Sequence, residues 1–309
     1  MAKVAHDFEP AYLALKKRGE LRERVKALRG LLRECTLCAR SCRVDRTVGA
    51  LGVCEADDTL TVSSVFPHFG EEPPLVGRFG SGTIFLTHCN LRCAFCQNWD
   101  ISHGGKGQRV TLEEVAEAMI WLQRNGCHNI NFVTPTHYAP LLVEAVDRAT
   151  ELGLRLPIVW NCGGYESLEA LRLLEGIVDI YMPDIKFAGS EPARKYLKAP
   201  DYPEVARDAL REMHRQVGDL EVVGGVALRG LLVRHLVMPQ DLAGSAQVME
   251  FLAGLSPDTY VNIMDQYRPC YQAGEFPELS RRITGEEFGR ALEAARNAGL
   301  RRGFERGYI

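Results

Sequence analysis

Three cysteines stand close together in the stretch THCNLRCAFCQNWDIS, residues 87–102. Cys89, Cys93 and Cys96 have the spacing C-x3-C-x2-C, and no fourth thiol follows nearby. Thiolates bind iron–sulfur clusters, and each iron of a four-iron cluster takes one ligand beyond its sulfides. Three thiolates would therefore leave one iron open to a substrate or cofactor, as an open position distinguishes a catalytic zinc from a structural one. The alternatives are a zinc site completed by His88 or a distant residue, or simply buried cysteines.

A second group of cysteines forms a complete set of four with the spacing C-x2-C-x3-C-x11-C. Its members are Cys35, Cys38, Cys42 and Cys54. Four thiolates suit a closed, structural zinc site. Rubredoxin-like iron or an auxiliary [4Fe–4S] cluster fits the same number of thiols, so the spacing leaves these metals open.

The composition excludes several classes of protein. The 309 residues are 46% hydrophobic and 25% charged, which suits one large domain or one domain with a small extension. A formal net charge of −3 gives no sign of the excess positive charge that proteins use to bind nucleic acid or an anionic membrane. The sequence has no apolar run of about 18 residues and no secretory signal at its start, so we expect a cytoplasmic protein. Clustered cysteines in that reducing compartment indicate metal or redox chemistry rather than disulfides.

Short apolar segments alternate with amphipathic helices from residue 83 onward. The segment 1–33 is helix-prone, with an irregular apolar stripe, and the Gly/Pro-rich segment 67–82 is predicted to be an ordered loop. Helices are predicted over 111–124 and from residue 284, each opened by a Thr-x-x-Glu capping box, Thr111 with Glu114 and Thr284 with Glu287. The predicted strands are 83–88, 129–134, 156–161, 178–183, 230–238 and 259–264.

Near-continuous apolar strands that alternate with helices predict a parallel sheet covered by helices. Six such repeats indicate an α/β fold built as an open, partial six-stranded β/α barrel over residues 81–309. Residues 1–80 are predicted to form a small helical and four-cysteine metal-binding extension. In parallel β/α architectures ligands bind at the C-terminal ends of the strands, where the first cysteine loop falls.

The cysteine loop resembles that of the radical S-adenosylmethionine (SAM) superfamily, whose hallmark is C-x3-C-x-aromatic-C after the first strand. Phe95 is the aromatic residue here. The resemblance implies a [4Fe–4S] cluster on the three cysteines, SAM as the fourth ligand through its amino and carboxylate groups, and Phe95 near the adenine. A donor such as flavodoxin or ferredoxin would reduce the cluster. Reductive cleavage of SAM would then give methionine and a 5′-deoxyadenosyl radical that abstracts hydrogen from the substrate.

Other strand ends offer polar groups for SAM. The second strand ends in Thr134 and Thr136 where many family members carry Gly-Gly-Glu, which is a departure from the pattern; His137 faces the site or caps the next helix. The third strand ends in Asn161 before two glycines. Because glycine lets a backbone approach a ligand closely, Asn161 is a further candidate for cofactor binding.

The fourth and fifth strands carry charged candidates. Asp184 and Lys186 resemble an Asp and a Lys that line the SAM pocket of pyruvate formate-lyase activating enzyme. The alternative is that Asp184 caps a helix and Lys186 is solvated. Arg234 lies among apolar strand residues. It resembles the family arginine that grips the SAM carboxylate, a role suited to a planar and permanently charged group.

The segments CTLCARSCRVDRTVGALGVC and FPHFGEEPPLVGRFGSGTIF resemble a group of pyruvate formate-lyase-activating-enzyme homologues with an N-terminal four-cysteine segment. The resemblance implies an enzyme that makes a glycyl radical, although the activating enzymes themselves lack this segment. Radical SAM modification of a peptide or small molecule is the second hypothesis, and a non-catalytic zinc-binding interaction module is the third.

Residues outside the main motifs have simpler interpretations: solvated loop charges for His68, Glu71 and Glu72, packing for Cys127 and Cys162, and a candidate extra thiol for Cys270.

Overall fold

Six parallel strands form the centre of the fold in the computed structural model, which describes residues 8–304. Their spatial order is β2, β4, β5, β6, β8 and β9, and every neighbouring pair is parallel. The predicted strands are confirmed with shifted ends, the largest shift being the earlier start of β8. The bounds are Ser81–Leu86 (β2), Ile130–Val133 (β4), Ile158–Cys162 (β5), Ile180–Pro183 (β6), Val226–Leu236 (β8) and Tyr260–Met264 (β9).

Three further strands at the margins of the sheet are antiparallel to their neighbours. β1 (Thr61–His68) pairs with β2 and with β3 (Gln108–Arg109), and β7 (Glu221–Val223) pairs with the start of β8. The segment 67–82, predicted to be loop, therefore begins inside β1, and it also contains α3 (Pro73–Val76). Among the described strands β2 and β9 do not pair with each other, so the predicted open, partial barrel is confirmed.

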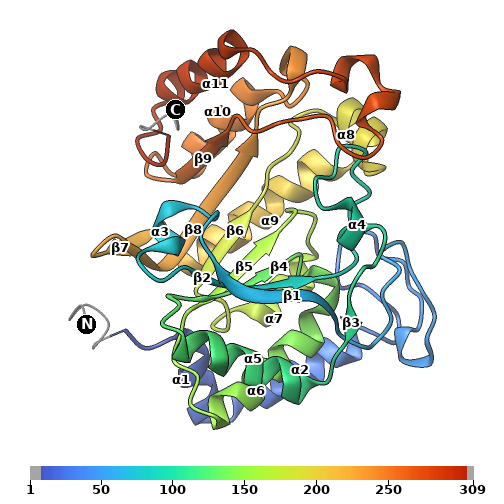
Figure 1. The fold of residues 1–309 in the computed structure, drawn as a ribbon, viewed down its shortest axis with the longest axis vertical. Coiled ribbons are helices and arrows are strands. Elements are labelled where there is room, and N and C mark those ends of the chain that lie inside the picture. The colour runs from blue at the N-terminus through green and yellow to red at the C-terminus, as the bar shows by residue number, and fades with distance from the viewer. Residues whose placement is uncertain (1–7, 305–309) are drawn as a thin grey trace.

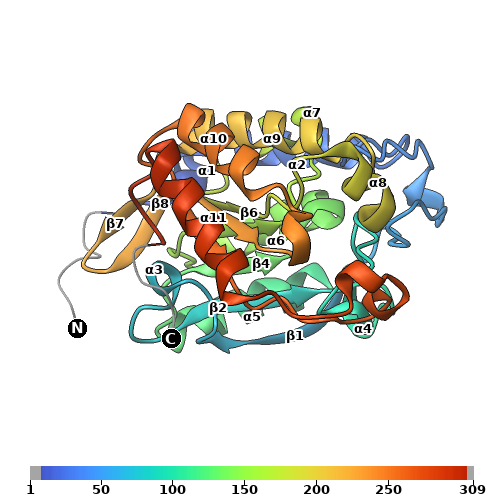
Figure 2. The ribbon, with the colours of Figure 1, turned by 90° about the horizontal axis from the view of Figure 1, so that it is seen from above.

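Helices cover the outer face of the parallel strands (Figures 1 and 2). Both predicted capping boxes are present: the Glu114 backbone N–H donates to Thr111 Oγ1 at 3.2 Å, and the Glu287 N–H donates to Thr284 Oγ1 at 3.2 Å. No described helix is long and apolar enough to cross a membrane. The other helices are α1 (Ala11–Arg18), α2 (Glu20–Gly30), α4 (Trp99–Ser102), α5 (Leu112–Arg124), α6 (Ala139–Glu151), α7 (Leu168–Leu174), α8 (Ser190–Leu197), α9 (Tyr202–Val217), α10 (Ser245–Leu255) and α11 (Gly285–Ala298).

The first two helices pack against the outside of the barrel. The predicted stripe of 1–33 is confirmed over the described residues, because Leu13, Leu21 and Leu28 are buried in the same core as the strand residues Phe132 and Trp160. α2 contacts α6 and α7, and α1 contacts α6. Residues 1–7 of the predicted helical segment lie outside the described part of the chain. The apolar stripe thus attaches the N-terminal segment to the barrel.

A buried carboxylate at the start of β6 fixes the beginning of α1. This helix has no side-chain cap of its own, and Asp179 Oδ1 accepts a hydrogen bond from the Ala11 N–H at 2.9 Å. Asp179 Oδ2 accepts a second bond from the Ile158 N–H at 3.1 Å, and Arg229 lies 3.5 Å away. Burial raises the pKa of Asp179 to about 6. One side chain therefore joins α1, β5 and β6 and satisfies an otherwise unpaired helix N–H group.

We expect Asp179→Ala to lower the free energy of unfolding by roughly 2–4 kcal/mol, because two buried backbone donors lose their acceptor. Asp179→Asn, which keeps one acceptor oxygen, should have a smaller effect. Urea denaturation followed by circular dichroism measures both. The matched control is Asp208→Ala on the exposed face of α9, where we expect a change within about 0.5 kcal/mol. An unchanged midpoint for Asp179→Ala would show that α1 does not depend on this anchor.

Candidate active site

The loop after β2 brings three thiols to the C-terminal end of the barrel. Cys93 is buried, while Cys89 and Cys96 are partly exposed. The Leu91 N–H donates to Cys89 Sγ at 3.4 Å, and Cys96 Sγ lies 3.0 Å from Ser102 Oγ. The aromatic residue of the motif, Phe95, is buried too, and its ring packs edge-on against Phe187 and Tyr267. The loop is thus held by its own backbone and by the hydrophobic cluster beneath it.

The surroundings of Cys89 and Cys93 oppose ionisation of these two thiols unless a cation binds. Burial raises the pKa of Cys93 to about 12, and the nearby Lys186 ammonium counteracts only part of that effect. Burial also raises the pKa of Cys89, and the neighbouring Cys93 adds to the increase. Thiolate is the form that binds metals. Three such thiols at one end of a cavity fit a cationic iron–sulfur core, which would stabilise all three in the thiolate form.

A group of partly buried charges lies at the ends of β6 and β8. Asp184 accepts a hydrogen bond from Lys186 Nζ at 2.5 Å and another from Arg234 Nε at 2.8 Å. Arg234 Nη2 donates to Asn161 Oδ1 at 2.7 Å. Burial would raise the pKa of Asp184, but Arg234 and Lys186 outweigh burial and hold the pKa below its ordinary value. The carboxylate is therefore ionised, and it bridges two cations from neighbouring strands.

Two glutamates from the loop after β1 join this group, although the sequence indicated solvated charges there. The Glu71 side chain is only 7% exposed, and its Oε2 lies 3.7 Å from Arg234 Nη1. Glu72 is buried as well; its Oε1 accepts a hydrogen bond from Asn262 on β9 at 3.0 Å, and its Oε2 has no partner. Burial raises the pKa of Glu71 to about 7. The sequence did contain a signal for this burial: two adjacent acidic residues, Glu71 and Glu72, are unusual inside an otherwise apolar Gly/Pro-rich loop.

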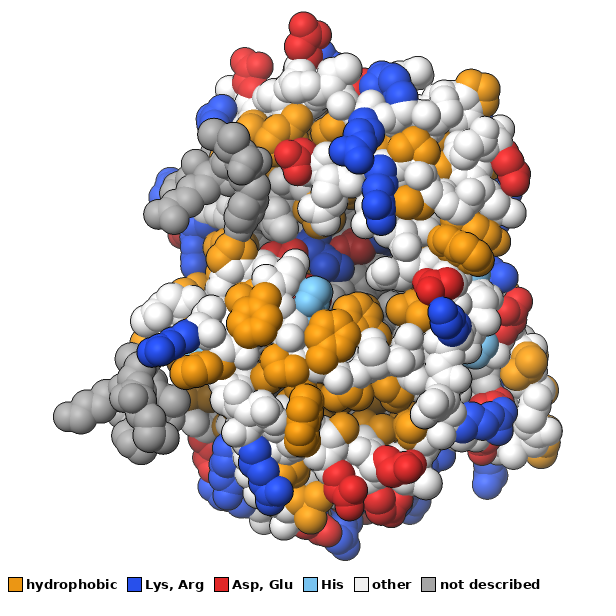
Figure 3. All heavy atoms as spheres, viewed as in Figure 1, with side chains coloured by type: hydrophobic (Ala, Val, Ile, Leu, Met, Phe, Trp, Pro, Cys, Tyr) orange, Lys and Arg blue, Asp and Glu red, His pale blue; other side chains and the backbone are white. Residues whose placement is uncertain are grey.

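One cavity of about 510 Å³ joins the thiols to the charged group. Figure 3 shows a hollow across this face, with charged side chains inside it and hydrophobic side chains along its border. The volume is typical of a site for a ligand of cofactor size. Of the residues predicted to bind metal or cofactor in the barrel, the lining includes all but one: Cys89, Cys93, Phe95, Cys96, Thr134, Asn161, Asp184, Lys186 and Arg234.

The exception is Thr136, which does not line the cavity. Its hydroxyl donates to Glu166 Oε1 at 2.6 Å in the interior. His137 next to it neither lines the cavity nor caps a helix, because its Nε2 lies 2.9 Å from the carbonyl oxygen of Thr87. Burial lowers the pKa of His137 to about 3, so the ring is neutral. It supports the backbone just before the cysteine loop, and no sequence pattern indicated that contact.

Tyr202, at the start of α9, has a positioning role that the sequence did not suggest. Its hydroxyl contacts the carbonyl oxygens of Gly163 and Asp184 at 2.9 Å each, and it accepts the Lys186 N–H at 2.9 Å. The side chain is fully buried. Because one hydroxyl joins the ends of β5 and β6, it fixes the backbone from which Asp184 and Lys186 extend.

The remaining cysteines differ in their surroundings. Cys127 is buried in the hydrophobic core, as predicted. Cys162 is buried too, and it also lines the cavity, where its charged neighbours are Glu166 and Asp184. Cys270 is half-buried and lies outside the cavity lining. None of these thiols replaces a member of the three-cysteine set.

The four N-terminal cysteines lie in one loop beside the barrel. The Cys35 N–H donates to the Val44 carbonyl, and the Arg43 N–H donates to the Cys35 carbonyl, so the two ends of the loop's first half are tied together. Burial raises the pKa of Cys38 and of Cys54, and both thiols interact electrostatically with Cys35. In the part of the chain that the structure describes, no three His, Cys, Asp or Glu side chains converge on one point as ligands of a single ion do. A metal at this loop stays a prediction.

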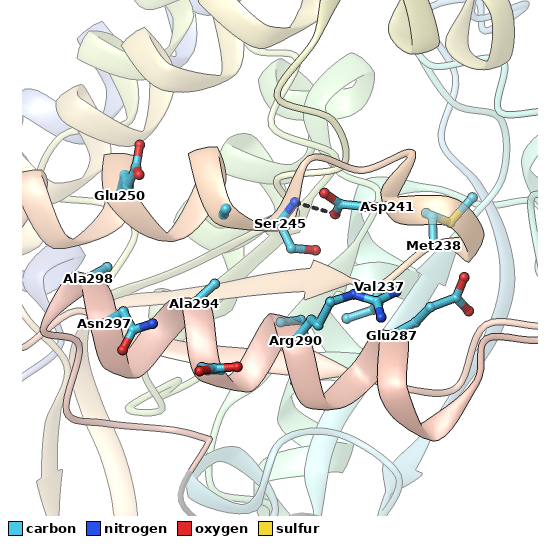
Figure 4. Close-up of a pocket in the computed structure, with 13 residues that line it drawn as sticks. Val237, Met238, Asp241, Ser245, Glu250, Glu287, Arg290, Ala294, Asn297 and Ala298 are labelled. Carbon is cyan, nitrogen blue, oxygen red and sulfur yellow. Dashed lines mark hydrogen bonds between the residues drawn. The ribbon is translucent and has the colours of Figure 1, made fainter.

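A second cavity, of about 450 Å³, lies between α10 and α11 (Figure 4). Two of its four acidic residues have internal partners: Asp241 accepts the Ser245 N–H at 3.0 Å, and Glu287 pairs with Arg281 at 2.7 Å and belongs to the capping box of α11. No cysteine lines it. These contacts give Asp241 and Glu287 a structural role at helix ends, and the thiols of the three-cysteine loop line the other cavity.

Comparison with known proteins identifies the barrel. The sequence profile of the radical SAM superfamily matches residues 83–236, from β2 to β8, and so includes the three-cysteine loop and Arg234. The uncharacterized protein MJ0674 of Methanocaldococcus jannaschii is 33% identical over 287 residues, which cover 90% of this chain and 78% of the relative.

A solved structure supports the fold. HydG, a maturase of the [FeFe]-hydrogenase, matches with a TM-score of 0.51 and 13% sequence identity over 73% of this chain. The match covers 52% of HydG, so this chain spans about half the length of that protein. The sequence profile, the related protein and the fold all agree with the presence of a three-cysteine loop at the end of the first parallel strand. This chain belongs to the radical SAM superfamily.

Proposed function

We propose that this radical SAM enzyme reductively cleaves SAM at Cys89, Cys93 and Cys96 and abstracts hydrogen from a substrate bound in the same cavity. The observation that carries the proposal is that the three thiols and the charged strand ends share one cavity of about 510 Å³. When bound, a [4Fe–4S] cluster supplies the electron that splits SAM into methionine and the 5′-deoxyadenosyl radical. The chain's own part is to hold the ligands in position and to exclude water.

The charged group is suited to SAM because it offers both signs of charge. Arg234 Nε and Nη2 already donate to Asp184 and Asn161, while Nη1 has only Glu71 at 3.7 Å, longer than a hydrogen bond. Nη1 is therefore the nitrogen available to a ligand carboxylate. Thr134, with a positive φ of 62° at the end of β4, offers backbone and hydroxyl groups on the same wall.

The surroundings of the cavity favour a large substrate, such as a protein or peptide. Phe66 stacks on the lining residue Phe85 and is 37% exposed, and Phe69, three positions further along the chain, is 63% exposed. On the other side, next to the lining residues 97–98, Trp99 stacks on Tyr271, and both are more than 40% exposed. Exposed apolar side chains in groups mark interaction surfaces. They support activation of a glycyl-radical enzyme, or modification of a peptide as the second candidate.

We further propose that Cys35, Cys38, Cys42 and Cys54 bind a second metal centre. The supporting observation is Arg46, whose guanidinium is fully buried and has no carboxylate within ion-pair distance among the described residues. Its partners are the carbonyl oxygens of His137 and Asp57, and its Nε has none. A buried cation without an anion is strongly unfavourable. Because Arg46 lies close enough to lower the pKa of Cys54, an anionic metal–thiolate centre would compensate its charge.

We expect Cys93→Ser to lose about four irons per chain and to form no 5′-deoxyadenosine, because a [4Fe–4S] cluster needs all three thiolates of this loop. Iron analysis, the EPR signal after dithionite reduction and chromatography of the products measure this under anaerobic conditions. Cys127→Ser is the matched control, since that thiol is buried in the core away from the cavity. Formation of 5′-deoxyadenosine at wild-type rates by Cys93→Ser would refute the assignment, as would wild-type protein with zinc in place of iron.

SAM affinity should rise with pH through the titration of Glu71. Its pKa is raised to about 7, so the carboxyl is mostly neutral at pH 6 and ionised at pH 8, where it attracts the sulfonium cation. We expect roughly fivefold tighter SAM binding at pH 8 than at pH 6, which corresponds to about 1 kcal/mol. Anaerobic equilibrium dialysis measures it. Glu71→Gln should remove this slope and leave only the titration of SAM itself; an equal slope in both proteins would exclude Glu71 as its source.

The two candidate substrate classes predict different products. An activase incubated with its partner, SAM and a reductant should leave a stable glycyl radical on the partner chain, visible by EPR as a doublet. A peptide- or small-molecule-modifying enzyme should instead consume SAM and give a diamagnetic product of altered mass. Mass spectrometry and EPR of the same reaction separate the two.

Phe69→Ser should slow either reaction on a protein substrate while SAM binding stays unchanged, because Phe69 lies outside the cavity lining.

A further inference from the structure

The four-cysteine loop and the three-cysteine loop are joined by contacts between residues that neighbour the thiols. Arg40, between Cys38 and Cys42 in sequence, donates from Nε to the carbonyl oxygen of Asn90 at 2.9 Å, and Asn90 follows Cys89. Its Nη2 also donates to the Leu197 carbonyl at 3.0 Å. The planar group thereby ties the N-terminal loop to the backbone of the cluster loop and of α8.

A second link runs beside the first. Arg92 Nη2 lies 3.2 Å from Glu55 Oε1. Arg92 directly precedes Cys93, and Glu55 directly follows Cys54. This second contact therefore joins the direct sequence neighbours of Cys93 and Cys54, whereas the first joins a residue two positions from Cys38 and Cys42 to the direct neighbour of Cys89.

The space between the two loops is filled with packed side chains. Ala39 packs against the hydrophobic cluster that contains Cys93 and Phe95. The Arg40 guanidinium lies 5.2 Å from the centre of the Tyr165 ring, and Asn90 Nδ2 donates to the Tyr165 carbonyl at 2.7 Å. Cys38 forms a β-bridge with Glu166. Bonded and closely packed atoms therefore connect the two sets of thiols.

The buried Arg46 provides a third connection. Its Nη1 donates to the His137 carbonyl at 2.7 Å, and the ring of the same histidine contacts the Thr87 carbonyl at 2.9 Å, two residues before Cys89. Arg46, through His137, and Arg40, directly, thus link two guanidinium groups of the N-terminal loop to the backbone that precedes or belongs to the three-cysteine loop. These cations would stabilise added negative charge at either centre.

The two loops differ in their access to solvent. The four-cysteine loop reaches the surface with Val48, Leu51 and Val53, which are 78%, 55% and 41% exposed, and Cys42 is partly exposed. The Val53 N–H donates to Cys42 Sγ at 3.4 Å, so the outermost part of the loop touches a thiol directly. The other thiols line the cavity that holds SAM and substrate in the proposed function. An outside electron donor therefore reaches the four-cysteine loop without displacing either ligand.

We propose that Cys35, Cys38, Cys42 and Cys54 hold a [4Fe–4S] cluster that passes single electrons to the cluster on Cys89, Cys93 and Cys96. This inference rests on the proposed function. Cys35, Cys38, Cys42 and Cys54 would hold the group that accepts one electron from a low-potential flavodoxin or ferredoxin, going from the 2+ to the 1+ state. Cys89, Cys93 and Cys96 would hold the group that receives this electron, so that the first would return to 2+ and the second would supply the electron used on SAM. Zinc has no redox chemistry and could not act in this way.

The first test uses the wild-type chain, reconstituted anaerobically with iron and sulfide. We expect about eight irons per chain and, after full reduction, EPR signals of two clusters that relax each other magnetically. The half-saturation power of the three-cysteine cluster should fall at least threefold in Cys42→Ser, which removes one ligand of the other cluster. Cys270→Ser, a half-buried thiol outside both sets, is the control and should match the wild type. Zinc on the N-terminal loop, or two clusters without mutual relaxation, would overturn the proposal.

The second test compares two electron sources. With reduced flavodoxin as the only donor, 5′-deoxyadenosine formation by Cys42→Ser should fall at least tenfold, whereas dithionite, a small reductant, should restore most of the rate. Equal rates with flavodoxin in both proteins would overturn the relay and indicate direct reduction near Trp99 and Tyr271. If wild-type protein forms no 5′-deoxyadenosine with dithionite, the proposed function fails, while the magnetic measurement still decides the proximity of two clusters.

A surface variant keeps the relay testable if Cys42→Ser does not fold. Val48→Glu combined with Leu51→Glu should leave both clusters intact and slow only the flavodoxin-driven reaction, because both side chains are exposed on the outer side of the loop. Val223→Glu on β7, 44% exposed in the wild type, is the matched control. An unchanged flavodoxin-driven rate in the double variant would show that the donor does not approach this loop.

Discussion

Asp184 and the two cations that contact it hold the C-terminal ends of neighbouring barrel strands together. The carboxylate is 17% exposed, and it contacts Lys186 from its own strand end and Arg234 from the next strand. Three largely buried charges in one place are stable only when each is paired, because removal of one partner would leave an uncompensated charge in a poorly solvated site. The strand ends of β5, β6 and β8 are therefore fixed relative to one another by their side chains as well as by the sheet.

Arg234 also helps to explain how the barrel can enclose a cavity although the described strands β2 and β9 do not pair. The loop after β1 crosses to the far side of the sheet, where Glu72 contacts Asn262 on β9 and approaches Arg234 on β8. α3, which follows this loop, packs beside β8 (Figure 1). Side chains thus close the gap that no backbone pairing closes. Because an acidic pair provides the closure, the charge of that wall depends on Glu71 and Glu72 as well as on the cations they face.

Local patterns predicted the elements well, and long-range contacts escaped prediction. The capping boxes at Thr111 and Thr284 and the apolar runs of the six parallel strands are signals that lie within a few residues, and the structure confirms them. Glu71 looked like a solvated loop charge because its partner Arg234 lies 163 positions further along the chain. His137 contacts a backbone carbonyl, which carries no side-chain signal at all. A single sequence specifies which residues are polar, but their partners depend on tertiary contacts.

The N-terminal segment and the three-cysteine loop both have strained backbone next to their cysteines. Ser41, Arg43 and Glu55, all next to a cysteine of the four-cysteine set, have positive φ angles, and so does His88, which precedes Cys89. Each such residue costs of the order of 1 kcal/mol, so the fold keeps these conformations only where neighbouring contacts over-determine them. Here the contacts are those of Arg40, Arg46 and Arg92 with the opposite loop or its supports. Because the strain lies beside the thiols of both sets, the two loops depend on one another for their geometry.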